Sequence, residues 1–116
     1  MKLREIIETL QATVVVNGHD QEMEVKRGCG SDLMSDVLHR LKPNALLLTG
    51  LTTPQSVYTA EMADLSVVCY VRGKTPDAEA VRLAEERGLV LLCTTLPMFE
   101  SCGRLYAKGL RGDSEI

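Results

Sequence analysis

The 116-residue chain has no tryptophan and few other aromatic residues, namely one phenylalanine and three tyrosines. Proteins that bind nucleic acid usually carry a basic stripe with interleaved aromatic side chains on which bases stack. This chain instead has a net charge of −3. The composition therefore gives no support to nucleic-acid binding.

Long apolar runs are also missing from the sequence. No run approaches the roughly 20 residues that a helix needs to span a bilayer. The first eight residues mix acidic with apolar side chains and lack the core of a signal peptide. We therefore expect a cytoplasmic protein without membrane contact, in which the four cysteines are reduced thiols and not a disulfide framework.

Short apolar runs alternate with helix-spaced segments along the second half of the chain. The runs over 45–49, 66–71 and 89–93 are apolar at almost every position, which predicts strands buried on both faces. Helices are predicted between and after these strands. Such alternation implies parallel pairing with right-handed crossovers. The fold class is therefore predicted as α/β, a small three-layer α/β/α sandwich with a mostly parallel sheet.

The limits of the helices follow from proline, glycine and apolar spacing. Prolines 54, 76 and 97 suit the first turns of three helices, and Gly88 is a typical helix stop. Earlier in the chain, the spacing predicts a helix over 3–10, a strand over 13–16 and a helix from 33 to 41. We expect one domain over residues 1–110 and a frayed tail over 111–116.

The segment Gly28-Cys29-Gly30 is predicted as a turn that leads into a helix beginning at Ser31 or Asp32. Unsatisfied N–H groups at a helix start carry partial positive charge and can bind an anion. Alternatively, the two glycines simply allow a tight turn into a capped helix. Asp32 counts against a phosphate here unless a cation bridges the two charges. Both interpretations remain open.

The carboxyl ends of the buried strands supply the rest of the candidate site, because ligands bind at this edge of a parallel sheet. Arg72 and Lys74 follow one strand and suit phosphate or carboxylate capture, although a solvated loop paired with nearby acids is the alternative. The threonines add hydroxyls that would otherwise be ordinary helix caps. The candidate ligand-binding residues are Gly28, Cys29, Gly30, Ser31, Thr49, Gly50, Thr52, Thr53, Arg72, Gly73, Lys74, Thr94 and Thr95.

The cysteines divide into two pairs. Cys69 and Cys93 lie within apolar strands and are most simply buried small hydrophobes. Cys29 and Cys102 each stand beside a glycine, and they would form a redox or metal site if they met. No Cys-x-x-Cys spacing supports this, so we expect no metal and no cofactor. No base accompanies a cysteine nucleophile in a recognisable pattern, and we expect no enzyme activity.

Five segments carry a resemblance to a known family: Gly28–Leu38, Leu46–Gln55, Thr59–Met62, Val71–Asp77 and Met98–Gly103. With these segments, nearly the whole chain resembles the short stand-alone members of the DRTGG domain family. The resemblance implies a small α/β domain, usually dimeric, without established enzymatic activity. Related domains are attached to phosphotransacetylases and to pyrophosphatases with nucleotide-sensing modules. The amino-terminal domain of HPr kinase/phosphorylase is similar in fold, but no Walker-type phosphate loop occurs here.

The chain departs from the motif that names the family. Leu51-Thr52-Thr53 stands where longer members carry an Asp-Arg pair, and Arg72-Gly73-Lys74 replaces the Thr-Gly-Gly turn. Ligand contacts of the Asp-Arg pair therefore do not carry over. Arg72 and Lys74 add positive charge that partly compensates.

Three hypotheses of function follow. The first is a non-catalytic regulatory module that binds a small anion or nucleotide and acts as a homodimer. The second is a cysteine-based redox or metal-handling protein that works through Cys29 and Cys102. The third is a pure protein–protein interaction scaffold that uses the apolar face of the first helix.

Overall fold

A five-stranded sheet forms the centre of the molecule in the computed structural model, which describes residues 1–40 and 43–112. Its strands are β1 (Thr13–Val16), β2 (Arg27–Gly30), β3 (Ala45–Thr49), β4 (Val67–Tyr70) and β5 (Val90–Cys93). They lie in the order β1-β5-β4-β3-β2. Strands β2 to β5 are parallel, and β1 pairs antiparallel with β5 at one edge. The predicted mostly parallel sheet is confirmed.

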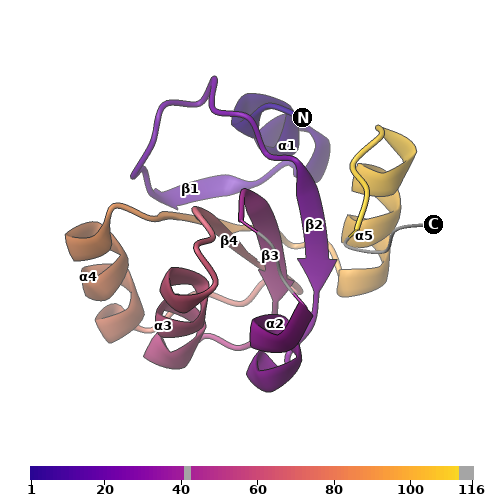
Figure 1. Cartoon of the computed structure of the whole chain (residues 1–116). Helices are drawn as coiled ribbons and strands as arrows, with labels where there is room; N and C mark the ends of the chain where they lie inside the picture. Colours follow the sequence, from indigo (N-terminus) through magenta and orange to yellow (C-terminus); the bar gives the residue numbers. More distant parts are fainter. Residues whose placement is uncertain (41–42, 113–116) are drawn as a thin grey trace.

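Helices cover both faces of this sheet. They are α1 (Leu3–Leu10), α2 (Met34–Arg40), α3 (Pro54–Met62), α4 (Ala78–Arg87) and α5 (Met98–Ala107). Helices α1 and α5 pack on one face, and α2, α3 and α4 pack on the other (Figure 1). Alternate residues of β3 serve the two cores: Leu47 faces α2 to α4, and Leu46 faces α1 and α5. This explains why the central strands are apolar throughout, and it confirms the three layers.

The predicted helix limits agree with the structure at several points. Pro54 occupies the first turn of α3, and Gly88 ends α4 in the left-handed region with φ 69°. Helix α2 begins at Met34 and not at Ser31 or Asp32. The predicted end of this helix at residue 41 lies outside the described residues.

Strand β2 is the main difference from the sequence prediction, because residues 27–30 form an edge strand and not a turn. The two glycines of this strand face α5. A Cβ atom on Gly30 would lie 2.9 Å from the Met98 Sδ atom, and one on Gly28 would lie 3.1 Å from Leu110 Cδ2. Close packing of α5 and Leu110 therefore explains the glycines better than turn geometry does.

The predicted frayed tail begins too early at residue 111. The Gly28 N–H donates to the Arg111 carbonyl at 2.9 Å, and Arg111 bridges Arg27 in parallel register on the outer side of β2. The Arg111 guanidinium also stacks on the Tyr106 ring, 4.2 Å from its centroid. Arg111 therefore belongs to the folded domain, while residues 113–116 lie outside the described part of the chain.

The apolar face of the first helix, expected as a free contact surface in the third hypothesis, is buried instead. Leu3, Ile6 and Leu10 of α1 belong to the core beneath α1 and α5. This face is used within the domain and offers no surface to a partner. None of the described helices is long and apolar enough to cross a membrane.

Candidate functional site

Hydrogen-bond donors from the end of β3 converge on the carboxylate of Asp32, which follows β2. Asp32 Oδ1 accepts from the Gly50 N–H at 2.6 Å and from the Thr49 hydroxyl at 3.1 Å. The Thr49 oxygen in turn accepts from the Leu51 N–H at 3.1 Å, which fixes the hydroxyl proton toward Asp32. Since parallel strands end at the same edge, the carboxyl end of β3 points its donors at one anionic oxygen.

Arg72, from the end of β4, approaches the same carboxylate. Its Nη2 atom lies 3.7 Å from Asp32 Oδ2. The guanidinium extends across Gly50, where a Cβ atom would collide with Nη2. The Arg72 and Asp32 side chains are 50% and 56% exposed, so this ion pair adds little to stability and stays accessible to solutes.

A strained turn positions Arg72. Arg72 and Gly73 have φ values of 62° and 71°, and the Lys74 N–H donates to the Val71 carbonyl at 3.2 Å. Two adjacent positive φ values are typical of a type I′ turn, a conformation that is unfavourable for arginine. The Arg72 N–H donates to Leu96 O at 2.9 Å and so holds the turn against the segment after β5. The neighbouring segment thus enforces a conformation that arginine would not choose alone.

Other predicted residues at this edge have internal roles. The buried Thr94 hydroxyl donates to Leu10 O at 2.8 Å and accepts from the Leu96 N–H at 3.2 Å. The Ser31 hydroxyl accepts from the Leu33 N–H at 3.1 Å, and so serves the connection into α2. The Thr52 carbonyl accepts from Asp77 N–H at 2.9 Å. These contacts shape the edge. Exposed side chains at Thr53, Lys74 and Thr95 complete its rim.

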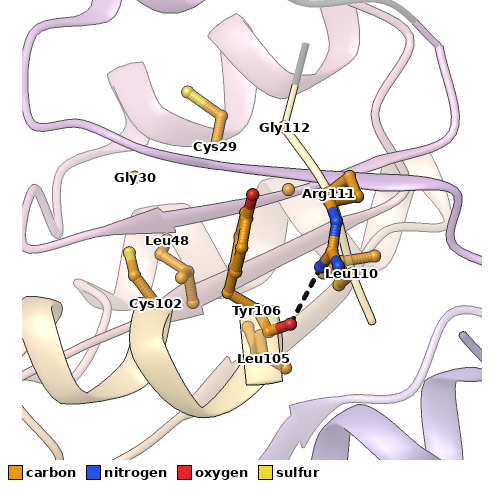
Figure 2. A pocket seen from close by; sticks show the side chains of 10 residues that line it. Cys29, Gly30, Leu48, Cys102, Leu105, Tyr106, Leu110, Arg111 and Gly112 are labelled. Atoms are coloured by element: carbon orange, nitrogen blue, oxygen red, sulfur yellow. Dashed lines mark hydrogen bonds between the residues drawn. The ribbon is translucent and has the colours of Figure 1, made fainter. Parts of the chain in front are cut away.

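The remaining predicted residues, Gly28, Cys29 and Gly30, line a different feature. They form one wall of a cavity of about 180 Å³ between β2 and α5 (Figure 2). The other lining residues are Leu48, Cys102, Leu105, Tyr106, Leu110, Arg111 and Gly112. The predicted composite site is thus divided between the strand ends and this mainly apolar cavity.

The structure does not bring Cys29 and Cys102 together. Cys29 pairs in register with Leu47, whose side chain faces α2 to α4, whereas Cys102 packs with the core beneath α5. Figure 2 shows their side chains on opposite sides of β2. Burial raises the pKa of the Cys102 thiol, which disfavours the reactive thiolate. Within residues 1–40 and 43–112, no three His, Cys, Asp or Glu side chains are arranged to hold a metal.

Asp32 is the residue at this edge that the sequence prediction left out of the candidate ligand-binding residues, because its charge was weighed as a repulsion toward phosphate. In the structure its Oδ1 atom accepts from the Gly50 N–H and from the Thr49 hydroxyl. The signal in the sequence is an aspartate directly after one strand and a glycine directly after its neighbour. This pattern predicts a contact between the two residues only if β2 is known to pair with β3.

The comparisons with known proteins agree with this architecture. The DRTGG domain model matches residues 5–107. The chain belongs to the DRTGG domain family. The resemblance stated from the sequence is therefore confirmed. A search of curated proteins finds no match.

Among solved structures, the DRTGG chain is similar to the CBS and DRTGG domains of the regulatory region of Clostridium perfringens pyrophosphatase, crystallised with the activator diadenosine tetraphosphate. The TM-score is 0.73 at 17% identity, over 97% of this chain and 48% of that chain. The chain thus spans about half the length of this relative. At such low identity the similarity shows the shared fold alone.

Proposed function

We propose that this DRTGG protein is a non-catalytic regulatory module that binds a small anionic ligand, such as a nucleotide phosphate, at the ends of β3 and β4. One observation carries the proposal: the Gly50 N–H, the Thr49 hydroxyl and the Arg72 guanidinium all converge on the Asp32 carboxylate. Backbone N–H groups and an arginine fork are the donors that proteins use for carboxylate and phosphate oxygens.

In this proposal Asp32 competes with the ligand for the same hydrogen-bond donors. Its carboxylate occupies the position that a ligand oxygen would take, and its exposure leaves it free to be displaced. Displacement would release the connection between β2 and α2 from the end of β3. Ligand binding would thereby be coupled to the position of α2, which is the kind of response that a regulatory module needs.

The nucleotide class is supported by the relative and by local charge. The pyrophosphatase region was crystallised with diadenosine tetraphosphate, although that region also contains CBS domains. Lys74 belongs to the same turn as Arg72 and lies exposed beside it, so it supplies a second positive charge for a chain of phosphates. With the family resemblance, we further propose a cytoplasmic homodimer.

Isothermal titration calorimetry tests the site with ATP, diadenosine tetraphosphate and inorganic pyrophosphate. Wild-type protein should bind at least one of them, and Arg72→Ala should weaken that binding at least about tenfold because a charge-assisted contact is lost. Asp32→Asn should bind more tightly, since the amide is a weaker competitor than the carboxylate.

Arg82→Ala is the matched control for the loss of one arginine, because Arg82 lies exposed on α4 and pairs with Glu79. It should bind as the wild type does. Absence of heat with all three compounds would remove the proposed function. Unchanged affinity in Arg72→Ala would remove the assigned site.

A further inference from the structure

We propose that the outer face of α5 pairs with α5 of a second copy of the chain in an antiparallel arrangement. This deepens the homodimer part of the proposed function and rests on it. The outer face of α5 consists of the exposed residues Phe99, Gly103, Tyr106 and Ala107, which with the half-buried Cys102 at its edge line a shallow groove of about 400 Å³. Phe99 is 84% and Tyr106 is 60% exposed, whereas the opposite face of α5 is buried against the sheet.

Gly103 is the residue of this face that the single chain does not explain. It lies in the interior of α5, where glycine lowers helix stability relative to alanine. A Cβ atom at Gly103 would meet nothing within 4 Å, in contrast to Gly28 and Gly30, whose neighbours crowd them. A glycine that nothing inside the domain requires is explained when a second backbone approaches it closely.

The charges beside this face are self-complementary. Glu100 and Arg104 lie one turn apart on the same flank and, within the described part of the chain, neither makes an ion pair. A twofold axis between Cys102 and Gly103 would place Glu100 of each copy near Arg104 of the other. The same axis would set Phe99 of one copy against Tyr106 of the other. This symmetry selects a second copy over an unrelated partner.

Helix α3 provides the internal comparison. It also exposes large apolar side chains, with Tyr58 50% and Met62 72% exposed. However, α3 contains no glycine, and its Glu61 already pairs with Arg87 of the same chain. The exposed apolar residues of α3 therefore lack both the close-approach position and the complementary charge found on α5.

Analytical ultracentrifugation over a dilution series tests the surface with Gly103→Gln. The long side chain has room in the single chain and would separate two packed helices, so the dimer Kd should rise at least about tenfold. Circular dichroism should show an unchanged fold. Met62→Gln, the control on α3, should dimerise as the wild type does. A Gly103→Gln protein that dimerises like the wild type would overturn the assigned surface.

A charge exchange tests the antiparallel orientation. Glu100→Arg should weaken dimerisation by placing like charges together, and adding Arg104→Glu should restore it. Failure of the double variant to recover would overturn the orientation. A wild-type protein that stays monomeric at every concentration would remove the homodimer itself. Calorimetry with pyrophosphate on the same samples reports separately on anion binding.

Discussion

At the scale of single residues, Arg72 adopts a backbone conformation that costs conformational free energy. Its φ of 62° is rarely adopted by residues with a side chain, and it persists because Leu96 O accepts from its N–H. Glycine would adopt this conformation without strain. In the proposed site, the guanidinium of Arg72 would offset this conformational cost by contributing to anion binding.

Replacing Arg72 by glycine and by alanine separates the cost of the turn from the role of the charge. Both variants lose the guanidinium, but only Arg72→Gly relieves the positive φ. We expect the free energy of unfolding of Arg72→Gly to be about 1 kcal/mol higher than that of Arg72→Ala. Urea denaturation measures this difference. Equal stabilities would show that the turn is not strained.

The burial of Tyr70 should make the stability of the fold depend on pH in the alkaline range. Its hydroxyl lies 2.8 Å from the Ser56 oxygen, and Ser56 donates its own proton to Thr53 O, so Tyr70 is the donor. Burial raises the pKa of Tyr70 from its ordinary 10.0 to about 12. Between these values the unfolded chain loses a proton that the folded protein keeps, so stability falls as pH rises.

The expected loss attributable to Tyr70 is up to about 3 kcal/mol across that pH range. Tyr70→Phe should remove this part of the pH dependence, measured by denaturation at a series of alkaline pH values. Tyr58→Phe, which removes an exposed hydroxyl from α3, is the control. If the Tyr70→Phe and wild-type curves stay parallel, Tyr70 does not ionise on unfolding.

At the scale of elements, β2 depends on the absence of side chains toward α5. Gly30→Ala should lower the free energy of unfolding by about 1–3 kcal/mol, because its Cβ would overlap with the Met98 and Cys102 sulfur atoms. In a Met98→Ala background the contact with the Met98 sulfur is absent, so Gly30→Ala should lower the free energy of unfolding by less than it does in the wild type. Thermal denaturation of the four proteins in this cycle measures the coupling. Strict additivity would mean that Met98 and position 30 do not compete for space.

At the scale of the whole molecule, some elements can be predicted from their own residues, and others depend on residues far away in the sequence. Strands β3, β4 and β5 could be predicted because burial on both faces makes them apolar throughout. The helix starts near prolines and the stop at Gly88 are equally local signals. Strand β2 could not be predicted, because its glycines are set by the packing of α5, far away in the sequence.

The same limit applies to the site. The strand-end rule indicated Thr49, Gly50 and Arg72 correctly as neighbours, since it needs only parallel pairing. The position of Asp32 depends on the register between β2 and β3, which hydrophobic periodicity does not contain. The sequence also could not show that the predicted site is divided between the strand ends and the cavity under α5, because this division too depends on how β2 pairs with β3.

The most direct test of the anion site follows the backbone amides of ¹⁵N-labelled protein by NMR during titration with inorganic pyrophosphate. If the anion replaces Asp32, the Gly50 and Thr49 amide signals should move together along one saturable curve. In Arg72→Ala the same additions should move them far less. Signals that move only around the cavity between β2 and α5, or that stay in place throughout, would contradict an anion site at the ends of β3 and β4.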